Sequence, residues 1–361
     1  MTRRLILVAL ALAAALCGHP VALAGDTPTA TAAPDMRERA MEALSWGDFD
    51  ELVALQQEAI HASVRDKDGF QQITPFGAGL ATLWNIGTPE ATDAYFANLD
   101  ALTASWLETH PQSSLARALR MRALYARAWW YRGDGYARTV SPQQFALFER
   151  YIQAALASAQ GEPIRSDDEM SHVYLVMIAR SASLDWRTQR ALAEDTLATH
   201  PEALGLWQEL LTSAEPRWGG DWDVVKRLVL DAATRQKTLE DGDVMYARLW
   251  VDASFELRGE FFRAPVDWIR LKRGLRSIVT HFPNSGSVND FAKLACLRQD
   301  RAAAQDMMDR LGDEADLRQW GGGNEARSAF DQCRRWLREP DALPPIEGAP
   351  EPAKRTGNTQ S

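Results

Sequence analysis

Apolar residues recur at helical spacing along most of the chain, and short breakers separate one run from the next. Between residues 114 and 132 they fall at Leu115, Leu119, Ala123, Ala126 and Trp130, which places them in one stripe on a helix. A helix must bury such a stripe against a neighbour. No segment of comparable length alternates apolar and polar residues with β-branched enrichment. The pattern therefore predicts an all-α protein.

The breakers are mostly Gly-Asp, Gly-Gly and His-Pro pairs, which end helices for conformational reasons. They divide the sequence into short helices joined by tight turns. The predicted helical ranges are 36–46, 49–60, 75–84, 90–109, 114–132, 145–159, 170–182, 186–199, 202–214, 222–233, 243–257, 265–282, 287–297, 300–311 and 324–337.

Several helix starts carry capping signatures. Ser141 is followed by proline and, three residues on, by Gln144, which is the pattern of a capping box. Ser166 and Glu169 have the same spacing, so Ser166 is expected to cap the helix over 170–182 while the acids at 167–169 face its positive end. Other expected N-caps are Thr88, Asp221, Asp300 and Asn324.

A short motif recurs between helices. His-Pro stands at 110–111 and 200–201, and His-Phe-Pro stands at 281–283. Spacings of about 90 and about 82 residues are too long for one tetratricopeptide repeat of about 34 residues. They suit two to three degenerate repeats each. The sequence therefore predicts an irregular helical-hairpin, tetratricopeptide-like solenoid.

Four segments, in order along the chain, carry a family resemblance. They are 47–52 (GDFDEL), 128–136 (AWWYRGDGY), 216–220 (PRWGG) and 291–296 (FAKLAC). In these segments the chain resembles a bacterial domain-of-unknown-function family of tetratricopeptide-like helical proteins. That family has no assigned activity, so the resemblance implies the helical fold and no catalytic residue.

The first residues have the pattern of a secretory signal peptide. Arg3 and Arg4 precede an apolar run over 5–16, and the small residues at 22–24 stand before Gly25. The apolar run is shorter than the roughly 20 residues of a spanning helix. We expect cleavage after residue 24 and a periplasmic or secreted product without stable membrane insertion.

This interpretation defines four regions. The expected signal peptide is 1–24, a flexible leader follows at 25–35, the helical domain covers 36–339, and a proline-rich tail over 340–361 is expected to be disordered. The net charge is −9 for the whole chain, and without residues 1–24 there remain 38 basic and 49 acidic residues, a balance of about −11. No basic stripe dominates, so nucleic acid is not an expected partner.

Two cysteines follow the expected cleavage point, Cys296 and Cys333. In an oxidising compartment an even count favours a disulfide. The alternative is a pair of buried thiols, each acting as a small apolar side chain. Both interpretations remain open from sequence, because spacing does not show whether the two Cα atoms come within about 7 Å.

Tryptophan is abundant, with 13 residues in 361. Trp129, Trp130, Trp218 and Trp222 are candidate binding residues, and Arg132 beside Gly-Asp-Gly is a candidate carboxylate ligand. The alternative is that these side chains fill the core or tie loops to helices. Other tryptophans fall within helices and are expected mostly in the core: Trp84, Trp106, Trp207, Trp250 and Trp268.

Patterns typical of known chemistry are not found in the sequence. Six histidines show no H-E-x-x-H or comparable metal spacing, and Asp66 to Gly69 lacks the acids of a calcium loop. Nucleophile elbows, Walker loops and dinucleotide fingerprints are not found either. The sequence thus assigns no catalytic residue, metal or cofactor.

The favoured function is a non-enzymatic scaffold of the cell envelope that binds a protein or peptide in the groove of a solenoid. One alternative is a carbohydrate-active or peptidoglycan-lytic enzyme on a helical scaffold, which would place two carboxyl groups about 5–10 Å apart across a cleft. Another is a small-ligand binding protein with an apolar pocket and a few convergent polar groups.

Overall fold

The computed structural model describes residues 35–81, 84, 92–133, 135, 137–160, 164–257, 261, 264–312, 315–321 and 323–339. Across these ranges the ordered elements are helices, and no residue is assigned to a strand. The all-α prediction is therefore confirmed. The expected signal peptide, most of the leader and the proline-rich tail lie outside the described residues.

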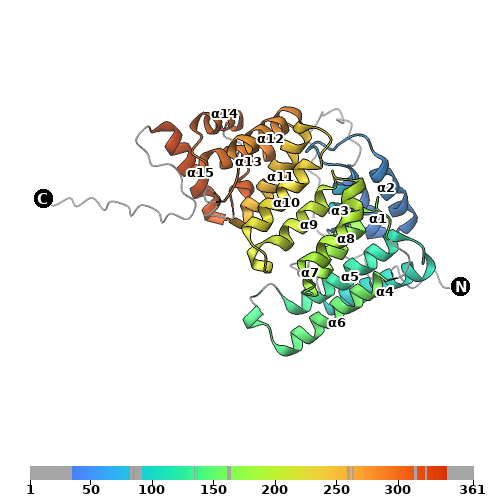
Figure 1. Cartoon of the computed structure of the whole chain (residues 1–361). Coiled ribbons are helices and arrows are strands. Elements are labelled where there is room, and N and C mark those ends of the chain that lie inside the picture. The colour runs from blue at the N-terminus through green and yellow to red at the C-terminus, as the bar shows by residue number, and fades with distance from the viewer. Residues whose placement is uncertain are drawn as a thin grey trace, which may run out of the picture. The chain divides into compact units, whose positions relative to one another are not determined.

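Figure 1 shows the helices in chain order, from α1 in blue to α15 in red. Their bounds are α1 Met36–Trp46, α2 Phe49–His61, α3 Ile73–Ala81, α4 Asp93–Thr109, α5 Ser114–Arg132, α6 Pro142–Ser158, α7 Glu169–Ser181, α8 Trp186–Thr199, α9 Leu204–Ala214, α10 Trp222–Thr234, α11 Leu239–Leu257, α12 Trp268–His281, α13 Ser285–Leu297, α14 Arg301–Leu311 and α15 Gly323–Arg338. Short 3₁₀ turns occur at η2 Ala137–Thr139, η3 Pro216–Trp218 and η5 Leu317–Trp320. None of the described helices combines the length and the apolar character that crossing a bilayer requires.

Helix starts agree with the capping signatures in part. The capping box of α6 is confirmed, because the Ser141 hydroxyl accepts from the Gln144 amide while the Gln144 side chain accepts from the Ser141 amide. Asp221 and Asp300 cap α10 and α14 as predicted. The box predicted at Ser166 is wrong, since Asp168 caps α7.

Two other predicted caps differ from the structure. The helix expected to start near Thr88 begins at Asp93, where the Thr92 hydroxyl accepts from the Tyr95 amide at 3.1 Å. Thr88 itself lies outside the described residues. Asn324 lies inside α15, which begins one residue earlier. At the start of α4 the cap is thus a second threonine, Thr92, which lies closer to the apolar residues of the helix.

Neighbouring helices pack as hairpins, and alternate helices also contact each other. Successive helices that pack against each other include α5 with α6, α7 with α8, α11 with α12 and α13 with α14. In addition α7 contacts both α5 and α9, and α9 contacts α11. The helices α5, α7, α9 and α11 therefore form one continuous row, which is the packing of a solenoid-like stack of hairpins.

The recurring His-Pro motif marks a structural period. Helices α4, α8 and α12 end at it, and their C-cap residues His110, His200 and Phe282 have nearly the same backbone angles. The φ and ψ angles are −131° and 64°, −128° and 67°, and −133° and 71° in that order. The motif thus recurs every four helices, which is once for every two hairpins.

Two clusters of buried side chains make up the core, one over α1 to α7 and one from α7 onward. Both include residues of α7, and Val173 packs against each of them. The indole rings of Trp84, Trp207 and Trp250 are fully buried. Trp106 is buried as well, and Trp268 is partly buried against the second cluster. These five tryptophans accordingly have packing roles.

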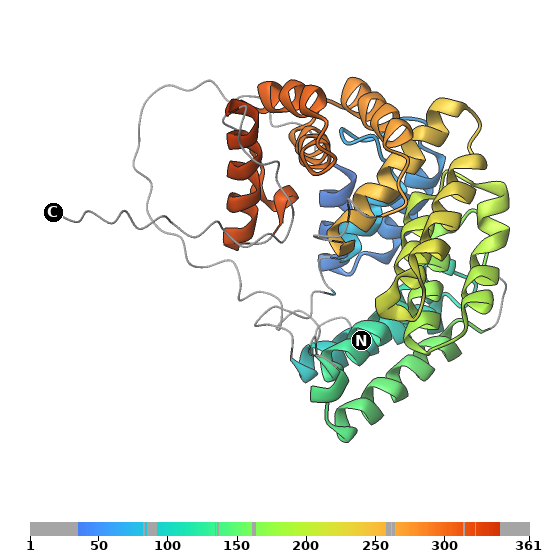
Figure 2. The same ribbon diagram turned by 60° about the vertical axis from the view of Figure 1, so that its left-hand side comes forward.

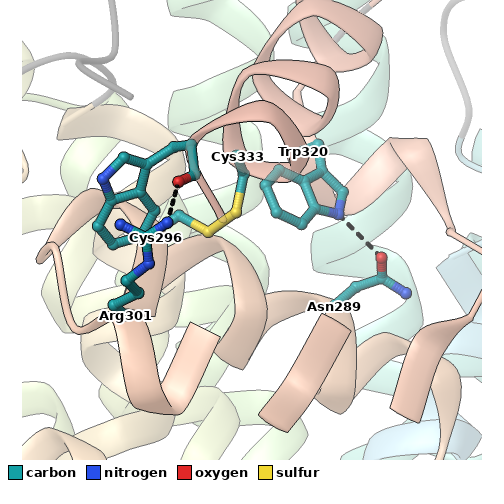
Figure 3. Close-up of a disulfide and its surroundings, with 6 residues drawn as sticks. Asn289, Cys296, Arg301, Trp320 and Cys333 are labelled. Atoms are coloured by element: carbon teal, nitrogen blue, oxygen red, sulfur yellow. Dashed lines mark hydrogen bonds between the residues drawn. A yellow bond between two sulfur atoms is a disulfide. The ribbon is translucent and has the colours of Figure 1, made fainter. Parts of the chain in front are cut away.

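A disulfide joins the last helix to the stack. Cys296 on α13 and Cys333 on α15 are bonded, with their Cα atoms 5.9 Å apart (Figure 3). Both are buried. Nearby, the Trp320 indole donates to Asn289 Oδ1 at 2.8 Å, and Arg301 donates to the Trp336 carbonyl at 2.7 Å. The bond constrains the separation of α13 and α15 in the unfolded chain as well as in the folded one.

Candidate functional site: a tryptophan and arginine cluster

A tight turn after α9 fixes the position of Trp218. The amides of Trp218 and Gly220 both donate to the Glu215 carbonyl, at 2.9 and 3.1 Å. The Arg217 guanidinium also donates to the buried Glu215 carboxylate, at 2.8 Å. Because backbone and side-chain bonds converge on one residue, the turn presents the Trp218 ring in a defined direction.

The Trp218 ring meets a tryptophan from a distant part of the sequence. Its centroid lies 6.2 Å from that of Trp129 on α5, and the planes cross at 78°. Trp129 is packed edge to face against Phe148 at 5.4 Å and lies 6.2 Å from Tyr125. Edge-to-face geometry is the favoured arrangement of aromatic pairs. Trp218 remains 38% exposed, so this aromatic patch reaches the surface.

Two arginines cover the paired indole rings. The Arg132 guanidinium lies 4.8 Å from the Trp129 ring centroid, and that of Arg180 lies 5.1 Å from the Trp218 centroid. Both distances suit cation–π attraction. Arg180 pairs with the Glu209 carboxylate at 2.7 Å. Arg132 donates to the carbonyls of Gly133 and Gly135, and no carboxylate among the described residues lies within 4.0 Å of it.

A third arginine, Arg122, lies on the same face of α5. Its guanidinium is 5.5 Å from the Tyr125 ring and 5.7 Å from the Trp84 ring. Burial lowers the pKa of Arg122, although nearby Tyr174, Tyr125 and Glu209 favour its charged form. In the part of the chain that the structure describes, no carboxylate comes within 4.0 Å of it.

We call these side chains the tryptophan–arginine cluster. Its members come from α5, α7, α9 and the η3 turn, which are neighbours in the row of alternate helices. The cluster consists of Arg122, Tyr125, Trp129, Arg132, Arg180, Glu209 and Trp218. Three guanidinium groups face a single carboxylate, so the cluster is locally cationic on a chain of net charge −9.

The composition of the cluster suits recognition of a partner. Tryptophan, tyrosine and arginine are the residue types that dominate the energetics of protein interfaces. The Trp129 indole Nε1 is buried and has no hydrogen-bond partner among the described residues. The cluster therefore offers aromatic faces and, within the described residues, two guanidinium groups without ion pairs in a single region.

The structure brings together three of the five predicted binding residues, Trp129, Arg132 and Trp218. It places the other two elsewhere. Trp130 packs against Phe96, with ring centroids 5.6 Å apart, and Trp222 is partly buried against the core. These two side chains take the packing role that the sequence left open as the alternative.

Sequence reasoning missed Arg122 and Arg180. A signal for Arg122 was present, since Arg122, Tyr125, Trp129 and Arg132 are spaced by three, four and three residues. That spacing places them on one face of a helix. Arg180 had no comparable signal, because its contact with the Trp218 ring joins two separate helical regions.

The carboxylate of Glu169 has a structural partner. Glu169 Oε1 accepts from the Gly205 amide at 2.8 Å and thereby caps α9. The N-cap residue of α9, Ala203, has no side-chain acceptor of its own. Burial raises the pKa of Glu169 to about 7, against the opposing effect of the Gly205 amide. The cavity beside it measures about 80 Å³. Within the described ranges, no group of three or more His, Cys, Asp or Glu side chains is placed to hold a metal ion.

Comparison of the chain with models of protein families, with curated proteins and with solved structures finds no match. The resemblance to a domain-of-unknown-function family therefore stays a prediction. Function is inferred from the geometry and charge of the tryptophan–arginine cluster.

Proposed function

We propose that the protein is a helical scaffold that binds a segment of another protein carrying acidic and aromatic side chains. The observation that supports this proposal most strongly is the contact of Trp129 with Trp218, flanked by the guanidinium groups of Arg132 and Arg180. An aromatic side chain of the partner would pack on the exposed Trp218 ring. Its carboxylates would pair with Arg132 and Arg122, which have no acidic partner among the described residues.

Charge complementarity favours an acidic segment over a neutral sugar. Arginine binds carboxylates with two parallel hydrogen bonds, which adds geometric specificity. The chain as a whole is acidic, with a net charge of −9. The net negative charge of the chain disfavours an acidic partner, whereas the guanidinium groups of the cluster attract one, which orients the encounter.

Export to the envelope is a second part of the proposal. It is supported by the signal-peptide pattern over residues 1–24, and a Cys296–Cys333 disulfide fits an oxidising compartment. The intact mass of the protein recovered from outside the cytoplasm is expected to match a chain that begins at Gly25. A mass that still includes residues 1–24 would overturn the proposed cleavage.

Selection from a random displayed peptide library tests the binding chemistry. We expect enriched peptides to combine Asp or Glu with Trp, Tyr or Phe. Trp218→Ala is expected to weaken their binding by about tenfold or more, as for a buried interface anchor. Arg132→Gln is expected to weaken binding and to reduce its sensitivity to salt. Trp46→Ala removes an indole that is 77% exposed on α1, and it serves as the matched control.

Two results would count against the proposed function. Enriched peptides without acidic residues would contradict the role of the arginines. Peptides that bind Trp218→Ala as tightly as the unmodified protein would remove the cluster from the interface. Saturable binding of soluble peptidoglycan fragments, with no peptide selected, would favour the carbohydrate-active alternative.

A further inference from the structure

A second concave site lies apart from the tryptophan–arginine cluster. It is a cavity of about 540 Å³ between the segment that follows α2 and the helices α11 and α12. In Figure 2 the blue segment after α2 passes beside the gold and orange helices α11 and α12. Its wall includes Arg65, Phe70, Val244, Arg248 and Phe282. A volume of this size is typical of small-ligand sites.

The segment over 65–70 is held in a fixed turn. Asp66 Oδ1 accepts from the amides of Asp68 and Phe70, at 2.9 and 2.7 Å. Gly69 has a φ of +77°, and a Cβ there would lie 2.5 Å from the Phe282 ring and 2.8 Å from Arg248 Nη2. The turn therefore approaches α11 and α12 as closely as glycine permits, and its Asp66 carboxylate is bound by its own backbone.

Arg248 occupies this wall without an acidic partner. Its Nη2 donates to the Asp68 carbonyl at 2.9 Å, and its guanidinium lies 4.2 Å from the Phe70 ring centroid. Burial, and to a lesser extent the charge of Arg65, lower the pKa of Arg248 to about 10, and the charges of Asp66 and Asp68 oppose this shift only in part. Among the described residues no carboxylate lies within 4.0 Å of it. A largely desolvated cation is costly unless a counter-charge is present.

Arg65 supplies a second guanidinium to the same cavity. It is exposed, and its Nη1 donates to the Gly69 carbonyl at 3.0 Å. No described carboxylate lies within 4.0 Å of this side chain either. The two arginines repel each other, as the lowered pKa of Arg248 reflects. An anion placed between them would relieve that repulsion.

The three acids that line the cavity contact other side chains. The first of them, Glu202, lies 3.8 Å from the His200 ring. Glu240 accepts from the Ser277 hydroxyl at 2.6 Å and lies 3.8 Å from the His281 ring. Asp241 accepts from the Thr238 hydroxyl at 2.7 Å. These contacts leave the guanidinium wall of Arg65 and Arg248 available to a ligand.

We infer that this cavity binds a small organic anion whose carboxylate or phosphate oxygens are held by Arg248 and Arg65, with its apolar part against Phe70 and Val244. Guanidinium groups bind either oxyanion through paired hydrogen bonds. The site lies on residues that the peptide-binding proposal does not use, so the two proposals stand or fall separately.

Thermal unfolding with two probes tests this site. Succinate and inorganic phosphate are titrated separately, each against sodium chloride at equal ionic strength. We expect one probe to raise the melting temperature saturably, because it binds the folded state alone. Succinate as the active probe identifies a carboxylate ligand, and phosphate identifies a phosphate ligand. In Arg248→Gln and in Arg65→Gln the apparent affinity is expected to fall by about tenfold or more.

The variants separate binding from folding. Arg65 is exposed and makes one hydrogen bond to the described part of the chain, so Arg65→Gln is expected to fold normally even if Arg248→Gln does not. Arg227→Gln on α10 removes an exposed arginine away from the cavity and is expected to keep the full response. The proposal is overturned if neither probe exceeds the chloride control, or if Arg65→Gln responds like the unmodified protein.

Discussion

Glu169 on α7 holds the start of α9 through a hydrogen bond. Its spacing from Ser166 matches a capping box, and an acid was expected at the start of this helix. The side chain instead caps α9 across the fold by accepting from the Gly205 amide. Local sequence does not show that α9 begins without a capping side chain, nor that α7 and α9 are neighbours. The choice between a local and a distant amide is made by tertiary packing.

Glu169 also predicts a pH dependence of stability. Burial raises the pKa of its carboxyl from 4.5 to about 7 in the folded state. Below pH 4.5 both states hold the proton. Between pH 4.5 and 7 the unfolded chain ionises first, so this group lowers the free energy of unfolding as pH rises, by on the order of 3 kcal/mol in total. Above pH 7 its contribution is constant.

Glu169→Gln isolates this effect, because the amide oxygen keeps the bond to Gly205 and does not ionise. We expect the variant to gain stability relative to the unmodified protein between pH 5 and pH 8, measured by urea unfolding at each pH. Asp290, whose pKa burial also raises to about 7, titrates in the same pH range in both proteins. The effect of Glu169 is therefore the difference in the free energy of unfolding between Glu169→Gln and the unmodified protein at each pH. A difference that is independent of pH would show that Glu169 is ionised in the folded state throughout.

At the scale of elements, the helices were predictable and their ends were less so. Apolar periodicity and Gly or His-Pro breakers located α1, α8 and α10 almost to the residue. The start of α11 was expected at Asp243 and lies at Leu239. The Thr238 hydroxyl accepts from the Asp241 amide at 3.0 Å, which is a local capping signal that the hydrophobic pattern concealed. Leu239 is exposed, so the first turn of α11 depends on its cap more than on burial.

Two glycines of α3 give a matched test of helix packing. A Cβ at Gly79 would lie 2.4 Å from the Arg37 carbonyl of α1, whereas a Cβ at Gly77 would have no atom within 4 Å. We expect Gly79→Ala to lower the free energy of unfolding by about 2 kcal/mol, because α1 and α3 must move apart. Gly77→Ala is expected to raise it by about 0.5–1 kcal/mol through helix propensity.

Urea unfolding of the two variants checks this pair directly. The two changes in the free energy of unfolding are expected to have opposite signs. Both substitutions add a methyl group to α3, but only the methyl group at position 79 meets α1. If both variants were stabilised, α1 would not approach α3 as closely as the structure shows.

At the scale of the whole chain, contacts between distant segments were beyond sequence reasoning. Tryptophan content pointed to Trp129 and Trp218 separately, but nothing local indicates that their rings lie 6.2 Å apart. The same is true of Arg248, which donates to the carbonyl of Asp68. Both contacts depend on how hairpins stack, which is set by many small packing choices along the row of helices. The fold class could therefore be predicted from the sequence, together with three members of the tryptophan–arginine cluster. The contacts that assemble either site could not.

Photo-crosslinking in the native envelope tests the central claim most directly. A benzophenone amino acid, which keeps an aromatic ring at the position and so preserves the stacking surface, replaces Trp218 in one protein and the exposed Trp46 in a control. The account predicts that position 218 captures one identified partner through a segment with acidic and aromatic residues. It also predicts that Arg132→Gln reduces the capture of this partner at position 218. The crosslinker at position 46 is expected not to capture the partner. Equal capture at both positions, or capture through a segment without acidic residues, would contradict the account.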